Sequence, residues 1–89
     1  MIYGIYTVKD ECVGYDRPLM FDNDNVAIRN FGLALEDENS YIYKFPSDYS
    51  LWHIADYDSD SGVLSPVVHK KIADAMQFKR RKEVNDVSE

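Results

Sequence analysis

Three carboxylates at alternate positions, Asp56-x-Asp58-x-Asp60, come closest to a recognisable chemical site in this sequence. Calcium-binding loops begin in this way, because carboxylate oxygens are ligands that the ion prefers. The match then ends, since Ser61 stands where such a loop needs glycine and Val67 stands where it needs a bidentate glutamate. We therefore expect an acidic hairpin turn, and neither a metal nor another cofactor.

Side chains that commonly act in acid–base or nucleophilic catalysis are few. His53 and His69 are the only histidines, and Cys12 is the only cysteine. Strict alternation along a strand would place Asp56 on the face opposite His53, so these two would not form an acid–base pair. We expect His53 to be structural or half-buried, His69 to lie on a helix surface and Cys12 to be a packing or surface thiol. With no nucleophile motif, phosphate-binding glycine loop or zinc pattern, the sequence predicts binding rather than catalysis.

Clustered cations late in the chain are the more serious candidate for a binding site. Residues 1–66 carry a net charge of −8, whereas residues 67–89 carry +2. Fixed cations on one segment can neutralise phosphates, although they can equally form a solvated tail that docks on a protein. Trp52 and the tyrosines could stack on unpaired bases or serve as core and interface. The candidate binding residues are Lys70, Lys71, Lys79, Arg80, Arg81, Lys82 and Trp52.

Hydrophobic periodicity then predicts the elements that position these residues. The pattern indicates a central strand over residues 2–8, a second strand over 12–15 and a short edge segment over 19–21. An Asp/Asn cluster at 22–25 predicts the start of a helix over about 24–36. Alternation returns at 49–57, and residues 63–64 can pair back as a hairpin. Ser65-Pro66 fits the start of a final helix.

The predicted fold class is therefore α+β: a small antiparallel sheet of three to five strands packed by one central helix, plus a C-terminal amphipathic basic helix. We divide the chain into an acidic core domain, residues 1–66, and a basic helix or tail, residues 67–89. No secretory signal or membrane-spanning segment is recognisable, and one lone cysteine fits a reducing cytoplasm. Edge strands in such a sheet also allow a homodimer.

Several short motifs resemble the small nonstructural protein of gokushovirus-type microviruses, which are single-stranded DNA phages. The resemblance covers roughly residues 2–64 and includes an Asn/Asp-capped helix reading D-x-x-A-x-R-x-F and a later strand closed by an aspartate and glycine turn. Ala55 stands where glycine is common. The matching residues are Pro18, Asp24, Ala27, Arg29, Phe31, Pro46, Asp48, Tyr49, Leu51, Trp52, Asp58 and Gly62.

This resemblance implies a bacteriophage protein of the host cytoplasm that is absent from the virion. It further implies a regulator of viral DNA synthesis, acting at the switch from double-stranded replication to single-strand production and packaging. No catalytic residues transfer with it. Our leading hypothesis is binding to a viral replication protein or a host protein, and the alternative is direct binding of single-stranded DNA by the basic tail and the sheet aromatics. A small hydrolase or nuclease is a distant third.

Overall fold

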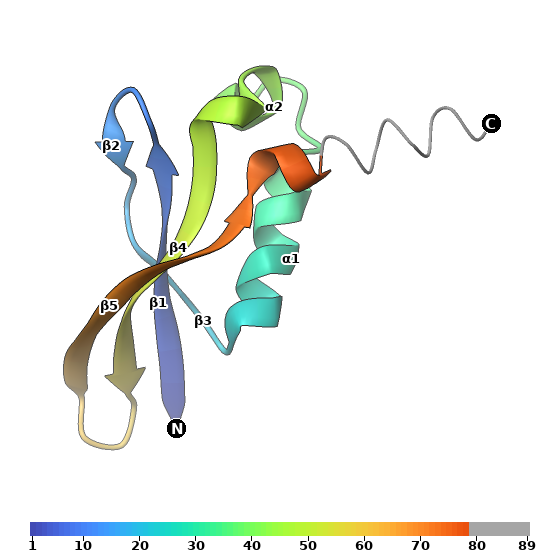
Figure 1. Ribbon diagram of the computed structural model, residues 1–89. Coiled ribbons are helices and arrows are strands. Elements are labelled where there is room, and N and C mark those ends of the chain that lie inside the picture. The colour runs from blue at the N-terminus through green and yellow to red at the C-terminus, as the bar shows by residue number, and fades with distance from the viewer. Residues whose placement is uncertain (79–89) are drawn as a thin grey trace.

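An antiparallel sheet forms the centre of the molecule, and one helix packs against one of its faces (Figure 1). The computed structural model describes residues 1–78. Four strands follow the order β2-β1-β4-β5, and β3 also pairs with β1. The predicted α+β class with an antiparallel sheet is confirmed, with five strands. The elements are β1 (Ile2–Asp10), β2 (Gly14–Tyr15), β3 (Leu19–Phe21), α1 (Asp24–Ala34), α2 (Tyr41–Lys44), a 3₁₀ turn η1 (Pro46–Asp48), β4 (Tyr49–Asp58) and β5 (Val63–Asp74).

Strand β1 is central, as its two largely apolar faces predict. It pairs with β2 and β3 along one edge and with β4 along the other. Tyr6 is buried on the face that carries α1, and its ring occupies the space that a side chain at Gly4 would need. Glycine at residue 4 therefore lets a large aromatic ring lie flat against the strand.

Helix α1 begins where the Asp/Asn cluster predicts. The side chain of Asn23 accepts a hydrogen bond from the Val26 N–H at 3.0 Å, which satisfies one of the free donors of the first turn. The apolar stripe of α1 then faces the sheet, and Arg29 is exposed. The buried core consists of Tyr6, Ala27, Phe31, Leu35, Leu51, Ala73 and Ala75.

Strand β4 contains a β-bulge at Ile54. Ile5 of β1 lies opposite Ala55, but the next residue, Tyr6, lies opposite His53, so Ile54 is an extra residue on β4. An extra residue reverses the alternation of side chains beyond it. As a result, His53 and Asp56 point to the same face of the sheet.

The predicted helix after Pro66 is wrong for residues 67–74, which form the second half of β5. Local signals favoured a helix. One side of β4 has backbone N–H and C=O groups that need hydrogen-bond partners, and β5 supplies them through pairs such as Leu51 with Ala73. Only residues 75–78 are helical in the described part of this region. The boundary that we drew between residues 66 and 67 falls inside β5. The remainder of the predicted basic helix, residues 79–89, lies outside the described residues.

Strand β5 forms an edge of the sheet, and its pairing with β4 is interrupted. His53 pairs with Lys70 and Ala55 with Pro66, so residues 67–69 of β5 bulge opposite the single residue Ile54. Val68 in this bulge is 92% exposed. A second shift leaves Ile72 as an extra residue between Lys71 and Ala73. Since Pro66 also lacks an N–H, the edge consists of short segments rather than one continuous ladder.

Candidate functional site

The sheet face opposite α1 has no helix over it within the described residues, and its side chains form four cross-strand rows. Residues directly opposite each other in antiparallel strands share a face, so the register gives the rows. Two rows are apolar and aromatic, and two carry cations. From the hairpin end upward the rows are Tyr3–Tyr57–Leu64, Met20–Ile5–Ala55–Pro66, Thr7–Trp52–Lys71 and Tyr15–Lys9–Ser50–Asp74. We call this surface the open face.

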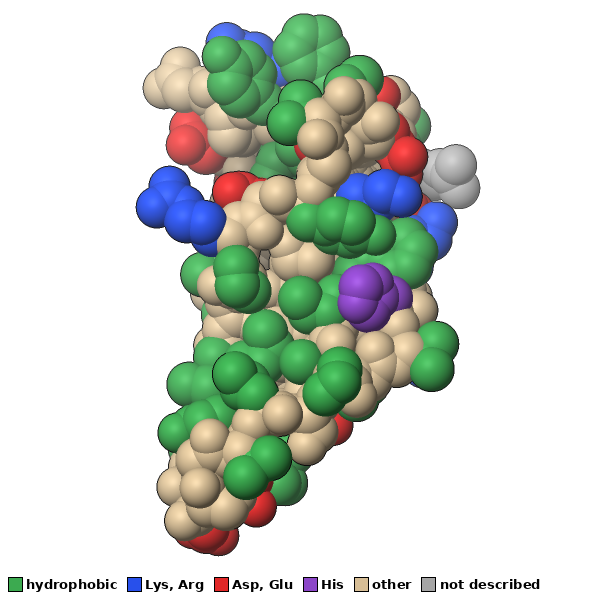
Figure 2. Space-filling model, turned by 90° about the vertical axis from the view of Figure 1, so that its left-hand side faces the viewer, with side chains coloured by type: hydrophobic (Ala, Val, Ile, Leu, Met, Phe, Trp, Pro, Cys, Tyr) green, Lys and Arg blue, Asp and Glu red, His purple; other side chains and the backbone are tan. Residues whose placement is uncertain are grey.

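Space-filling representation of the open face shows hydrophobic side chains over most of the sheet (Figure 2). A histidine and several Lys or Arg side chains lie in its upper half, and acidic side chains gather at the lower tip and the upper margin. The rows themselves contain one acidic residue, Asp74. A chain with a net charge of −6 thus presents one apolar and locally cationic face.

Aromatic rings and lysines are in contact in the upper rows of the open face. The ammonium of Lys9 lies 5.5 Å from the ring centre of Trp52 and 5.7 Å from that of Tyr15. The Tyr15 and His69 rings meet edge to face at 6.2 Å, and the indole N–H of Trp52 donates to the Ser50 hydroxyl at 2.8 Å. We call Lys9, Tyr15, Trp52, His69 and Lys71 the aromatic–cation cluster.

Three of the binding residues that the sequence indicated lie within the described chain, and two of them meet. Trp52 on β4 is directly opposite Lys71 on β5. Lys70 is the register partner of His53 and belongs to the other side of the sheet. The remaining candidates, Lys79, Arg80, Arg81 and Lys82, lie outside the described residues.

Sequence reasoning missed three members of the cluster. We ended the first predicted strand at residue 8, before Lys9, did not single out Tyr15, and placed His69 on a helix surface, whereas it lies on β5. The available signal was the hairpin between residues 2–8 and 12–15, which brings Tyr15 opposite Lys9. Their meeting with Trp52 depends on the pairing of β1 with β4, which no local pattern specifies.

On the helix side of the sheet, His53 and Asp56 do form a pair, so the prediction that they would not is wrong. His53 Nε2 lies 2.8 Å from Asp56 Oδ1, because the bulge at Ile54 returns both side chains to one face. The His53 ring also lies 5.0 Å from that of Tyr6, whose hydroxyl donates to Asp24 at 2.6 Å. Among residues 1–78 no hydroxyl or thiol donates a hydrogen bond to His53, as a catalytic nucleophile would. The contacts from Asp24 through Tyr6 and His53 to Asp56 instead connect α1 with the bulge.

Two tyrosines on this side are held in their neutral form. Burial raises the pKa of Tyr6, and the hydrogen bond to Asp24 and the charges of Asp24 and Asp56 raise it further. Burial likewise raises the pKa of Tyr49, with a hydrogen bond to Asp10 as the next cause. Neither hydroxyl is therefore prepared to act as a base near neutral pH, and both stabilise the packing of the sheet.

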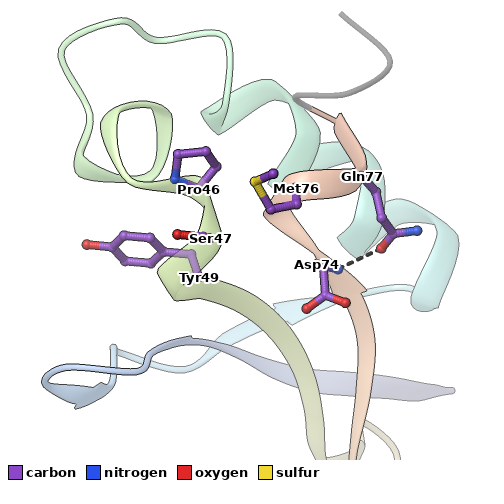
Figure 3. Close-up of a pocket in the computed structure, with 6 residues that line it drawn as sticks. All are labelled: Pro46, Ser47, Tyr49, Asp74, Met76 and Gln77. Atoms are coloured by element: carbon purple, nitrogen blue, oxygen red, sulfur yellow. Dashed lines mark hydrogen bonds between the residues drawn. The ribbon is translucent and has the colours of Figure 1, made fainter.

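A cavity of about 300 Å³ opens where β4 begins and β5 ends (Figure 3). Asp74 contributes to its wall and is also the end of the uppermost row of the open face. The Asp74 N–H donates to Gln77 Oε1 at 2.6 Å, while the Asp74 carboxylate points away from Gln77. The lining residues are Pro46, Ser47, Tyr49, Asp74, Met76 and Gln77.

Within residues 1–78, no group of three or more His, Cys, Asp or Glu side chains is arranged to hold a metal ion. The acidic hairpin turn binds the N-terminal amine instead, with Met1 N 3.2 Å from Asp60 Oδ2 and 4.0 Å from Asp58 Oδ1. No helix in the described part of the chain is long and apolar enough to cross a membrane.

Comparison with known proteins gives one result. A family model described as "Phage ORF5 protein" matches residues 3–78, which includes the whole sheet apart from Ile2. No curated protein and no solved structure matches the chain.

Proposed function

Since the chain belongs to the Phage ORF5 protein family, we propose that it is a phage accessory protein that binds single-stranded DNA through its open face. The observation that carries this proposal is the contact of Trp52 with Lys9, next to Tyr15 and opposite Lys71. Proteins that bind single strands combine aromatic side chains, on which bases stack, with cations that follow the phosphates. An open antiparallel sheet supplies both on one surface.

Geometry supports a single strand better than a duplex as the ligand. Trp52 and Tyr15 are side chains of the sheet surface, and successive rows along a strand are about 7 Å apart. Bases can stack on such rings only when they are unpaired. A duplex would offer mainly its phosphates, and the acidic remainder of the molecule repels these. The apolar rows near the hairpin end extend the surface along which bases can lie.

The biological role that we propose is the one implied by the resemblance to gokushovirus-type nonstructural proteins. Newly made viral single strands in the host cytoplasm would be the ligand, and their binding would promote single-strand production over double-stranded replication. Action by binding rather than by catalysis fits the arrangement of His53, whose hydrogen bond is to Asp56 rather than to a nucleophile. The basic residues 79–82 would add phosphate contacts to those of the open face.

Titration of a labelled single-stranded oligonucleotide, followed by fluorescence anisotropy at low and moderate salt, tests the proposal. We expect binding that weakens steeply with salt and a much weaker signal from the matched duplex. Trp52 is the only tryptophan, so its own fluorescence should be quenched in the same titration.

Two other outcomes would contradict the proposal. Absence of binding at either salt concentration would leave a replication or host protein as the ligand, which is the hypothesis that the sequence alone favoured. Metal-dependent cleavage of the oligonucleotide in the same tube would show an enzyme instead. A pull-down from infected cells, with and without residues 67–89, would then identify the partner.

A further inference from the structure

Both lysines of the aromatic–cation cluster are already paired with carboxylates of the same chain. Lys9 Nζ lies 3.8 Å from Glu11 Oε2, and Lys71 Nζ lies 3.2 Å from Asp74 Oδ1. Lys9 in addition lies over the rings of Trp52 and Tyr15. The positive charges and one aromatic surface that a DNA strand would use are therefore engaged within the protein.

The backbones that carry the two carboxylates are fixed by hydrogen bonds. Glu11 directly follows β1, and its N–H donates to the Asp48 carbonyl at 2.9 Å. Asp74 is the last residue of β5, and its N–H donates to Gln77 at 2.6 Å (Figure 3). Each carboxylate is therefore carried by a fixed backbone position within reach of its lysine.

The lysines lie on either side of Trp52. Lys9 belongs to β1 and Lys71 to β5, with β4 between them, and Lys9 lies one row beyond Lys71, so their backbones are about 12 Å apart. Each ammonium group has its own carboxylate partner, so a ligand must bring an anionic group to each lysine in order to displace both carboxylates. A strand that crosses the Trp52 ring can place one phosphate near each.

We propose that Glu11 and Asp74 are intramolecular competitors that occupy Lys9 and Lys71 until a ligand with at least two phosphates displaces both. This inference rests on the proposed binding of single-stranded DNA and adds a means of keeping that binding weak and reversible. Ion pairs at exposed positions are weak, so each competitor should lower the affinity by a factor of about two to five. Such a site releases its strand readily, as a protein that acts at a stage of replication requires.

Neutral isosteres of the two carboxylates test the inference, with anisotropy of a labelled single strand as the measurement. We expect Glu11→Gln and Asp74→Asn each to bind the strand about two- to five-fold more tightly and with a steeper salt dependence. The matched controls are Glu38→Gln and Asp37→Asn, which make the same changes of charge in the exposed segment after α1. These controls should change the affinity much less.

Double variants separate competition from the general effect of charge. If Glu11 acts through Lys9, Glu11→Gln should lose its effect in a Lys9→Ala background, and Asp74→Asn should lose its effect beside Lys71→Ala. Equal gains in the controls and the carboxylate variants, or gains that persist without the lysines, would overturn the inference. The wild-type titration is read separately: a wild-type protein that does not bind the strand contradicts the proposed function itself.

Discussion

Trp52 is the side chain on which the proposed binding mode depends most directly. It stands between Thr7 of β1 and Lys71 of β5, and its indole is oriented by the hydrogen bond to Ser50. This hydrogen bond limits rotation of the ring. A base that stacks on it would meet a surface with little conformational freedom left to lose.

Replacement of Trp52 by alanine should weaken binding of single-stranded DNA by about 1–3 kcal/mol, the usual contribution of one base stacked on an aromatic ring. Anisotropy of a labelled oligonucleotide measures this change, and Trp52→Phe should retain part of the affinity. Tyr41→Ala is the matched control, because Tyr41 is an exposed aromatic residue on α2, away from the open face. An unchanged affinity in Trp52→Ala would exclude the open face as the binding surface.

Tyr6 predicts how stability depends on alkaline pH. Burial and Asp24 raise its pKa in the folded protein, so the unfolded chain loses this proton first, near pH 10. Stability from Tyr6 is present below that pH and falls as the pH rises toward the folded-state pKa. The raised pKa of Tyr49 acts with the same sign.

Thermal unfolding between pH 8 and pH 11 checks this expectation. The melting temperature should fall above about pH 10, and the fall should be smaller in Tyr6→Phe, which cannot ionise. Tyr41→Phe, at a position that is 71% exposed, should follow the wild-type profile. A profile in Tyr6→Phe as steep as that of the wild type would show that other groups cause the loss.

At the scale of elements, the first turn of α1 depends on its cap. Asn23→Ala removes the acceptor for the Val26 N–H and should cost about 0.5–2 kcal/mol of unfolding free energy. Urea unfolding followed by circular dichroism measures it. Asn25→Ala is the matched control within the same turn, and a loss of equal size there would mean that the cap contributes nothing specific.

Elements with a continuous hydrophobic pattern could be predicted from the sequence, and β5, whose pattern is broken by Ser65-Pro66, could not. Residues 2–8, 24–36 and 49–57 show clear periodicity, and each forms the predicted strand or helix. The prediction for β5 was wrong because Ser65-Pro66 and the spacing of Val68 and Ile72 suit a helix locally. Pairing with β4 determines that this segment is a strand.

The same limit applies to the candidate site. Residue type alone singled out Trp52 and Lys71, which lie together on the open face. Their contacts with Lys9 and Tyr15 come from strands distant in sequence. The pair of His53 with Asp56 depends on one extra residue, Ile54, which a strict two-residue alternation does not anticipate.

At the scale of the whole molecule, the distribution of charge determines how strongly a polyanion is attracted. Removal of residues 79–89 deletes the cations Lys79, Arg80, Arg81 and Lys82. If these contact phosphates, the slope of log affinity against log salt should decrease by up to about 3 for a single strand. Binding should weaken to a similar extent for strands of different sequence, because phosphate contacts do not read bases.

The matched control for that deletion replaces the same four cations by glutamine in the full-length chain. Loss of salt dependence in both variants would assign the effect to charge. If neither variant changes the affinity or its salt dependence, the open face alone accounts for DNA binding. Residues 79–89 would then be candidates for binding a protein partner.

The interruption of β5 also bears on how the protein behaves when it is concentrated. A continuous twelve-residue edge with three valines would be a template on which strands of other copies could add, as they do in fibrils. Pro66, the bulge at residues 67–69 and the extra residue Ile72 divide that edge into short pieces. We expect the protein to resist fibril formation, and making the edge more regular by deleting two of residues 67–69 should promote it.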